Sequence, residues 1–468
     1  MTEALDMTVR VLVGELERRF PYASALISGS SGIQINDTGG EQNASEVNPT
    51  RGIVFTVHDG SALVEYATAT LAPDRLAREV RAWAGGLAQP GSAAPNGAGE
   101  QQGEGSKGSS IAQQRTFETT LLRDPAAVSL PDKLAHIRDI QRRAHALDPR
   151  IVQARVGYAD NTHHTTYVGR GSVLAQQVTR TRLFLMLAVS DGAQVRYHFL
   201  NHGGTGGFEL ADVSDEQIHN TLNIALRLLE AEKIEPGEYD IVADNSISGV
   251  LAHESFGHGV EMDLYPKGRA LSAKYLDRPV AAPAVQMFDD PSVAGAHGSY
   301  FFDDEGQLAR PTQILRDGVF VQPISDLASS LLAHGAHTPN GRRQDFTRKV
   351  YARMSNTFFA AGDTPPAEII AGVERGVYVR ECESGMEDPM GWGIQITAHY
   401  GEEIVNGRLT GRLFAPVAIT GYVPDVLGGI CAIGNDFQLD PGTCGKGHKE
   451  YIPVSSGGPH LRTRARLG

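Results

Sequence analysis

Residues 236–259 read PGEYDIVADNSISGVLAHESFGHG, and this stretch decides how the chain is divided. Pro236-Gly237 ends the segment before it, and Tyr239 to Val242 is a short run that reads as a strand. Asp244-Asn245-Ser246 follows, and these residue types favour a helix N-terminus because their side chains accept hydrogen bonds from free backbone N–H groups. The stretch therefore predicts a strand that leads directly into a helix with two histidines.

The sequence patterns before and after Pro236-Gly237 predict different secondary structure. Ser214 to Lys233 is the clearest helix before it, with Ser214 and Gln217 spaced as a capping box. After it come short extended runs between glycine-bearing turns, such as Val319 to Pro323, Gly376 to Arg380 and Gly393 to Ala398. We expect an α+β protein with a mixed α/β N-terminal domain at residues 1–235 and a β-rich C-terminal domain at 236–468.

The N-terminal domain mixes helical and strand periodicity. Helical spacing of apolar residues predicts helices at Met1 to Phe20, Leu71 to Trp83 and Pro131 to Leu147. Extended runs predict strands at Ser24 to Asn36, Gly52 to His58, Ile151 to Tyr158, Leu183 to Val189 and Val195 to Leu200. Asp191-Gly192 between the last two runs is a strong hairpin signal. A polar turn is expected at Asp160 to Thr162, which would leave His163 and His164 in solvent.

Residues 85–114 interrupt this patterning. Their composition falls to Gly, Ser, Ala, Gln and Pro, with almost no large apolar residue to bury. We interpret the segment as a flexible surface insertion, with a lid as the functional alternative.

Composition excludes several classes of protein. A length of 468 residues suits two or three domains, and a net charge of -13 with no block of basic residues argues against a nucleic-acid partner. Three cysteines are too few for a disulfide framework, and their number is odd, which indicates a reducing compartment. No apolar stretch approaches the ~20 residues that cross a membrane, and the first helix lacks a signal peptide's apolar core. We expect a cytoplasmic protein with no membrane partner.

The helix after Asp244 contains the pattern H-E-x-x-x-H, formed by His253, Glu254 and His258. It has one more spacer residue than the helix signature of zinc proteases. At ~100° per residue, positions i and i+5 lie ~140° apart, so a regular α-helix cannot aim both histidines at one ion. The spacing works if the helix widens into a π-bulge or ends at the second histidine, and Gly257 and Gly259 make such distortions cheap.

A hydrolytic zinc site needs three protein ligands and an open position for water. A third ligand could be Glu261, Asp263 or a distant cysteine. Cys444 is the favoured cysteine because glycines flank it and Lys446 would favour its thiolate. The alternative interpretation makes both histidines core or capping residues and Glu254 a surface acid.

The other two cysteines are weaker candidates. Cys431 lies in the apolar run Ile430 to Ile433, which predicts a buried packing residue. Cys382 lies between two glutamates, which would raise the pKa of its thiol.

Six motifs follow one another along the chain. They are Gly249 to Asp263, Phe302 to Gly306, Pro339 to Arg343, Arg353 to Thr357, Gly434 to Asp436 and Cys444 to Lys446. From about Ile151 to the C-terminus, the chain resembles the TldD/PmbA family of metallopeptidases. It resembles the metal-binding member, because that subunit has H-E-x-x-x-H and a C-terminal cysteine, whereas its partner subunit lacks them.

The resemblance implies a zinc peptidase. His253, His258 and Cys444 would ligate the zinc, and Glu254 would be the general base. The implied fold has an α/β N-terminal half and a β-rich C-terminal half. The implied substrates are unfolded polypeptides and modified peptide precursors, admitted as extended strands into an enclosed dimer. That dimer is either a homodimer or a heterodimer with a paralogous subunit that lacks the metal motif.

Three departures from the family keep other functions open. Residues 85–114 are not a family feature, and residues 380–411 replace a usual glycine-rich strand with residues such as Cys382, Met386 and Trp392. After Cys444 to Lys446 the family commonly has a Gly-Gln pair, whereas here Gly447 is followed by His448 and Lys449. One alternative is a non-catalytic peptide-binding partner subunit, against which the intact metal motif argues. The other is a metal-dependent processing enzyme for one dedicated peptide, which the divergent segment favours.

Overall fold

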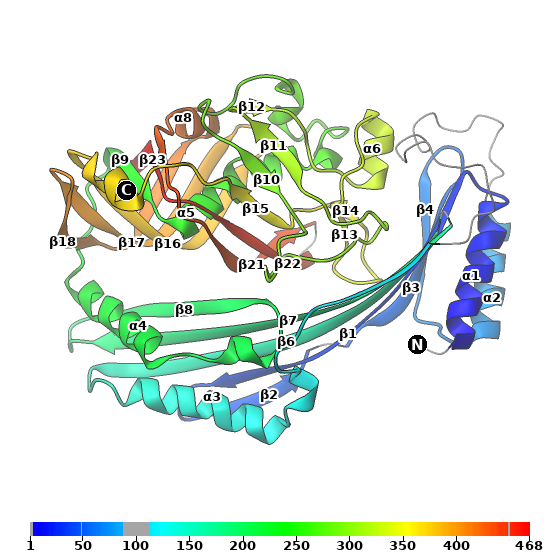
Figure 1. Cartoon of the computed structure of the whole chain (residues 1–468), viewed down its shortest axis with the longest axis horizontal. Helices are drawn as coiled ribbons and strands as arrows, with labels where there is room; N and C mark the ends of the chain where they lie inside the picture. The colour runs from blue at the N-terminus through cyan, green and yellow to red at the C-terminus, as the bar shows by residue number, and fades with distance from the viewer. Residues whose placement is uncertain (1–2, 48, 88–112, 170, 448–449) are drawn as a thin grey trace.

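The computed structural model describes residues 3–47, 49–87, 113–169, 171–447 and 450–468. The insertion expected at 85–114 lies mostly outside these residues; within them, Gly85 ends one helix and Gln113 begins a strand. The N-terminal residues build one long curved sheet, and the C-terminal residues build further sheets that lie against it (Figure 1). The expected α+β fold class with a β-rich C-terminal half is confirmed.

The N-terminal sheet has eight strands in the order β4-β3-β1-β6-β7-β5, with β2 paired to β1 and β8 paired to β7. Its strands are β1 (Tyr22–Asp37), β2 (Gln42–Glu46), β3 (Arg51–His58), β4 (Leu63–Thr68), β5 (Gln113–Glu118), β6 (Ile151–Gly169), β7 (Ser172–Ser190) and β8 (Val195–Thr205). Its helices are α1 (Glu3–Glu17), α2 (Pro73–Gly85), α3 (Leu130–His145) and α4 (Asp215–Arg227). Helices α1 and α2 cover one end of the sheet, and α3 and α4 lie at the other (Figure 1).

Two local predictions are confirmed in this sheet and its helices. Strands β7 and β8 form the expected hairpin around Asp191-Gly192, and Ser190 pairs with Val195. The N-terminus of α4 has the expected capping box, in which Ser214 and Gln217 satisfy each other's backbone N–H groups. Both signals are local, so they survive tertiary folding unchanged.

Strand β6 shows where a local prediction is wrong. Residues 160–162 form no turn, because β6 continues through them and pairs with both β1 and β7. The carboxylate of Asp160 is buried, and it binds the ammonium of Lys133 at 2.6 Å. This partner lets a charged residue occupy a central strand. His163 and His164 lie within the same strand, where His164 is exposed as expected and His163 is half-buried.

The C-terminal part contains two main sheets and a short pair, β13-β14. One sheet has seven strands in the order β16-β9-β23-β19-β17-β18, with β20 paired to β23; β16 also pairs with β17, which closes a ring of strands. The second has six strands in the order β12-β11-β10-β15-β22-β21, so β21 is an edge strand. The strands are β9 (Gly237–Ala243), β10 (Met287–Asp289), β11 (Thr312–Arg316), β12 (Val319–Phe320), β13 (Gly341–Arg342), β14 (Tyr351–Ala352), β15 (Asn356–Phe359), β16 (Arg375–Asp388), β17 (Gly393–Val405), β18 (Arg408–Phe414), β19 (Val417–Tyr422), β20 (Ala432–Ile433), β21 (Gln438–Lys446), β22 (Glu450–Gly458) and β23 (Leu461–Leu467). The helices are α5 (Asn245–Val250), which continues as a π-helix over Leu251–Gly257, α6 (Leu327–Ala333), α7 (Pro366–Ala371) and α8 (Val423–Gly428).

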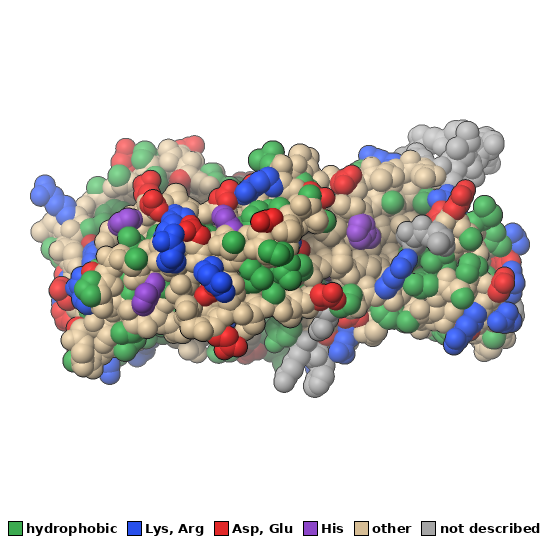
Figure 2. Space-filling model, turned by 90° about the horizontal axis from the view of Figure 1, so that it is seen from below, with side chains coloured by type: hydrophobic (Ala, Val, Ile, Leu, Met, Phe, Trp, Pro, Cys, Tyr) green, Lys and Arg blue, Asp and Glu red, His purple; other side chains and the backbone are tan. Residues whose placement is uncertain are grey.

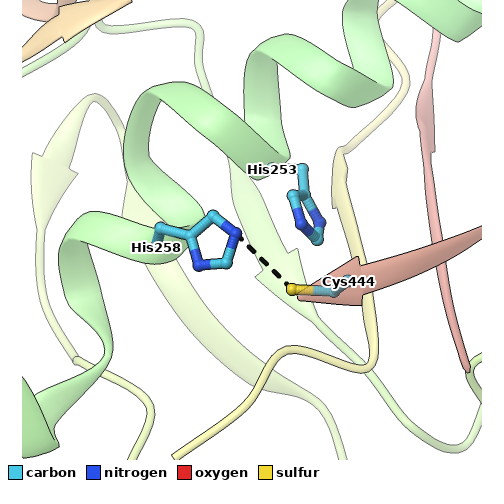
Figure 3. Close-up of side chains that lie close together, drawn as sticks. All are labelled: His253, His258 and Cys444. Atoms are coloured by element: carbon cyan, nitrogen blue, oxygen red, sulfur yellow. Dashed lines mark hydrogen bonds between the residues drawn. The ribbon is translucent and has the colours of Figure 1, made fainter. Parts of the chain in front are cut away.

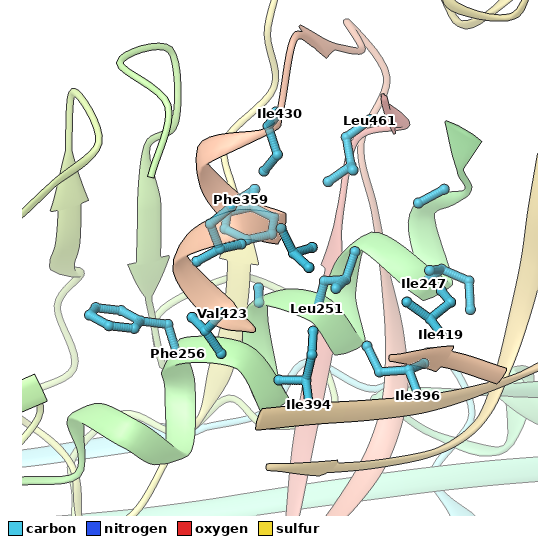
Figure 4. Packing of buried hydrophobic residues seen from close by; sticks show 14 of the residues in the cluster. Ile247, Leu251, Phe256, Phe359, Ile394, Ile396, Ile419, Val423, Ile430 and Leu461 are labelled. Carbon is cyan, nitrogen blue, oxygen red and sulfur yellow. The ribbon is translucent and has the colours of Figure 1, made fainter. Parts of the chain in front are cut away.

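The histidine-bearing helix passes through the apolar core of the C-terminal part (Figure 4). Leu251 and Phe256 are fully buried there, beside Ile394 and Ile396 of β17. Burying a side chain of this size contributes about 1.5–3 kcal/mol. The helix is therefore fixed from one side by its apolar residues, and its polar residues project from the other.

The two parts meet where β8 lies against β21. The side-chain amide of Asn201 on β8 donates to the carbonyl oxygen of Pro441 on β21 at 3.1 Å. The N-terminal sheet thus faces the strand that carries Cys444.

The face of the molecule seen from below in Figure 1 has a mixed surface. Figure 2 shows Lys and Arg side chains interspersed with Asp and Glu side chains over this face. Among the described residues, no helix combines the length and the apolar character needed to span a bilayer.

Candidate metal centre

The helix that carries the histidines changes its geometry where the sequence pattern requires it. Asp244 caps α5 by accepting a hydrogen bond from the backbone N–H of Ile247 at 2.9 Å. The helix then widens into the π-helix Leu251–Gly257 and ends in a 3₁₀ turn that starts at His258. Both distortions expected from the five-residue spacing are therefore present. They bring the rings of His253 and His258 to 4.9 Å between centroids.

Gly257 explains why the widened turn is tolerated at this place. A Cβ atom on Gly257 would overlap the sulfur of Met354, so glycine lets the turn pack closely against that residue. Met354 is fully buried and belongs to the motif Arg353 to Thr357.

Cys444 completes a cluster of three potential ligands. It lies on β21, and its Sγ is 3.5 Å from Nε2 of His258 (Figure 3). The potential ligand atoms of His253, His258 and Cys444 all lie within 4.8 Å of one another. The structure thus brings together the three residues that the sequence predicted as ligands, from segments 186 residues apart.

This donor set fits a zinc ion. Nitrogen and sulfur ligands at roughly 2.0–2.1 and 2.3 Å from one tetrahedral centre are ~3.5 Å apart, which agrees with the separation of His258 and Cys444. His253 is buried, and its Nδ1 has no hydrogen-bond partner among the described residues. Two imidazoles and a thiolate are ligands that zinc accepts in place of harder oxygen donors.

The charge states of the cluster suit metal binding. Burial alone would raise the pKa of the Cys444 thiol, but His258 and His253 outweigh burial and hold that pKa well below its usual range. Burial alone would lower the pKa of His258, but the Cys444 thiolate and Glu261 outweigh it and raise that pKa well above its usual value. The pair is therefore a thiolate beside an imidazolium, and a divalent cation can replace the proton between them.

Glu261 and Asp263 support the cluster and do not complete it. Oε2 of Glu261 lies 3.2 Å from Nδ1 of His258, on the side of the ring away from Cys444. Lys446 holds both acids, with Nζ 2.8 Å from Glu261 and 2.6 Å from Asp263. Lys446 therefore acts on His258 through Glu261. A carboxylate behind a ligating histidine fixes the orientation and the tautomer of the ring.

Arg353 is a supporting residue to which the sequence interpretation gave no role. It is fully buried and donates a hydrogen bond from Nη2 to the carbonyl oxygen of Cys444 at 2.8 Å. Its guanidinium also helps lower the pKa of Glu261 to about 2, where Lys446 and His258 outweigh the opposing effect of burial. In the sequence, only its position in the motif Arg353 to Thr357 indicated that this arginine could matter for the site.

The other cysteines are not part of this cluster. Cys431 is exposed, so the prediction that it is a buried packing residue is wrong. It follows α8 at the start of a short edge strand, where neighbouring apolar residues turn inward while its own side chain faces solvent. Cys382 is partly buried; burial first, and then Glu254 and Asp244, raise the pKa of its thiol to about 12.

Glu254 and His253 line the same large cavity. The cavity has a volume of about 600 Å³ and is lined by His253, Glu254 and parts of β7, β8, β16, β21 and β22. Gly385 of β16 lies against the Glu254 side chain, where a Cβ atom would overlap it. A carboxylate, a potential metal ligand and room for an extended chain therefore meet on one wall.

Comparison with known proteins defines the class to which this fold and site belong. Residues 236–466 match the family described as PmbA/TldA metallopeptidase C-terminal domain. A metalloprotease of Methanothermobacter thermautotrophicus is 32% identical over 346 residues, which cover 73% of this chain and 75% of the relative. A zinc metalloprotease TldD homolog of Saccharolobus solfataricus is 23% identical and covers 71% of this chain and 75% of the relative.

Solved structures share the same fold over the whole chain. A candidate modulator of DNA gyrase from Thermotoga maritima superposes with a TM-score of 0.77 over 100% of both chains, at 18% identity. The chain belongs to the TldD/PmbA family.

Proposed function

We propose that this chain is a zinc-dependent peptidase that hydrolyses peptide bonds in unfolded polypeptides or precursor peptides. The observation that carries the proposal is the cluster of His253, His258 and Cys444, whose member His253 lines a cavity together with Glu254. The names of the curated relatives, metalloprotease and zinc metalloprotease, support the same activity and the same metal.

The residues of the site have separate roles in metal binding, proton transfer and positioning. His253, His258 and Cys444 would hold the zinc ion, which supplies a Lewis acid that activates water and polarises the peptide carbonyl. Glu254 accepts the proton of the attacking water and delivers it to the departing amine, as a general base and then a general acid. Glu261 holds the ring of His258 in place, and Arg353 holds the backbone of Cys444.

Exchange of Glu254 for glutamine tests this assignment. Glu254→Gln keeps the size of the side chain and removes its basicity, so we expect zinc binding to persist while kcat falls by about 10²–10⁴-fold. The readouts are zinc per chain by elemental analysis and cleavage of unfolded casein followed by mass spectrometry. Glu374→Gln, at an exposed position, is the matched control and should keep full activity. Full activity of zinc-loaded Glu254→Gln would show that another group is the base.

The proposal extends to assembly. The resemblance to the TldD/PmbA family favours a dimer, formed with a second copy or with a paralogous subunit that lacks the metal motif. Sedimentation analysis of the chain alone distinguishes these two forms.

A further inference from the structure

The cavity beside Glu254 has an excess of acidic side chains. Its lining contains the carboxylates Asp244, Glu254, Glu381, Glu383 and Asp440. The arginines in the lining are Arg182 and Arg380. Walls of one charge sign around a cavity attract ligands of the opposite charge.

Several of these charges have partners within the protein. Glu383 accepts hydrogen bonds from the ring of His399 at 2.6 Å and from the hydroxyl of Tyr197 at 2.7 Å. Asp244 caps α5 and lies 3.9 Å from the guanidinium of Arg380. These carboxylates hold elements of the fold together and have little capacity left for a ligand.

The two arginines are also engaged. The guanidinium of Arg380 lies over the rings of Tyr378 and Tyr400, at 5.0 and 5.5 Å from their centroids. Arg182 of β7 donates from Nε to the side-chain oxygen of Asn201 at 2.8 Å. Neither arginine reaches ion-pair distance of Glu381 or Asp440 among the described residues.

Among the acids of this wall in the described part of the chain, Glu381 is the one with a buried carboxylate oxygen that lacks a hydrogen-bond partner. Its residue takes a left-handed conformation with φ of 56°, next to the irregularity between Cys382 and Ser384 in the pairing of β16 with β17. Its backbone N–H turns to the carboxylate of Asp244, at 3.0 Å. Its Oε2 is buried without a hydrogen-bond partner among the described residues, 3.3 Å from the ring of His198.

The ring of His198 does not neutralise this carboxylate. Burial, with His399 and Arg380 nearby, lowers the pKa of His198 to about 3, so the ring is uncharged at neutral pH. Burial and Asp244 raise the pKa of Glu381 to about 8 although Arg380 is beside it. Without a ligand the carboxyl is therefore largely protonated at neutral pH, and a positive group in the cavity would favour its ionised form and become the charge partner that the fold does not supply.

We propose that this cavity selects substrates that carry a positive group, a lysine or arginine side chain or a free N-terminal ammonium, and that Glu381 is the residue that determines this preference. The inference rests on the proposed peptidase function, since it names the substrate class of the same cavity. Asp440 contributes a second carboxylate. Its Oδ1 accepts a hydrogen bond from the side-chain amide of Gln438 at 2.7 Å, but this neighbour carries no positive charge to balance the carboxylate.

Paired peptides test the preference directly. Each pair differs only by lysine or norleucine at one position, and each peptide is made with a free and with an acetylated N-terminus. For the zinc-loaded full chain, we expect kcat/KM to be about tenfold or more higher for the lysine peptide, as one charge-assisted hydrogen bond provides. The acetylated arm shows whether the side chain or the terminal ammonium is recognised.

Variants locate the preference. Glu381→Gln should bring the lysine peptide to the rate of the norleucine peptide. Asp440→Asn should reduce the preference in part. Glu238→Gln, on an exposed ion pair with Arg464, should change neither rate. Equal rates for both peptides in the unsubstituted chain would overturn the inference and leave the peptidase function standing.

A binding measurement separates this inference from the proposed function. Zinc-loaded Glu254→Gln is titrated into fluorescently labelled peptides, and anisotropy gives Kd without cleavage. We expect the lysine peptide to bind about tenfold tighter than the norleucine peptide, and this difference to vanish in Glu254→Gln combined with Glu381→Gln. Absence of cleavage with this preference present would overturn the peptidase function alone. Equal Kd values would overturn the inference.

Discussion

Nδ1 of His258 lies 3.2 Å from Oε2 of Glu261, so a carboxylate supports one predicted metal ligand from behind. Glu261→Gln removes the charge of this carboxylate and keeps its size. We expect the affinity for zinc to fall by about 10–100-fold, as for other partners of metal-ligating histidines. Competition with a chromogenic chelator measures the affinity. Glu238→Gln is the control at an exposed site, and an unchanged affinity in Glu261→Gln would contradict the supporting role.

Cys444 and Cys431 form a matched pair for testing the third ligand. Cys444 is buried beside His258, and Cys431 is exposed. Since a serine hydroxyl does not ionise at neutral pH, Cys444→Ser should lose stoichiometric zinc, whereas Cys431→Ser should keep it. Elemental analysis after dialysis gives the zinc content of both. Retention of stoichiometric zinc by Cys444→Ser would mean that another residue is the ligand.

Substitution of alanine for Gly257 and for Gly14 should change the free energy of unfolding in opposite directions. A Cβ atom on Gly257 would overlap Met354, so Gly257→Ala should cost about 1–3 kcal/mol of unfolding free energy. Gly14 lies inside helix α1 with open space around it, so Gly14→Ala should gain about 0.5–1 kcal/mol. Urea unfolding measures both. If Gly257→Ala were as stable as the unsubstituted chain, the close packing of the π-helix against Met354 would not be required.

The buried ring of His297 should lower the free energy of unfolding in acid. Burial, with Arg180 and Arg182 adding to it, lowers its pKa from 6.5 to about 3. Between these pH values the unfolded chain binds a proton that the folded chain does not. The free energy of unfolding therefore falls as the pH falls, by up to ~1.4 kcal/mol per pH unit from this residue. Above pH 6.5 the histidine has no such effect.

His297→Gln isolates this contribution from other titrating groups. Urea unfolding at a series of pH values should show a smaller slope between about pH 6 and 4 in the variant than in the unsubstituted chain. Equal slopes in the two proteins would show that His297 is not held neutral in the folded state.

Local signals predicted the elements that depend on local contacts. The capping box of α4, the hairpin after β7 and the strand before α5 occur where the sequence placed them. The polar turn expected at residues 160–162 is absent because Lys133, distant in sequence, neutralises Asp160 inside the sheet. Cys431 is exposed although its neighbours are apolar, since the path of the strand decides which side chain faces inward.

The sequence by itself determined the chemistry that the site requires. The spacing of His253 and His258 demands a widened helix or a helix end, because 3.6 residues per turn cannot place both rings on one side. The tertiary structure decided which of the open candidates lies beside the two histidines. It brings β21 and Cys444 to the histidines, and it assigns Glu261 and Asp263 to Lys446. The acidity of the cavity was also beyond the sequence, because Glu381 and Asp440 meet there only through the packing of separate strands.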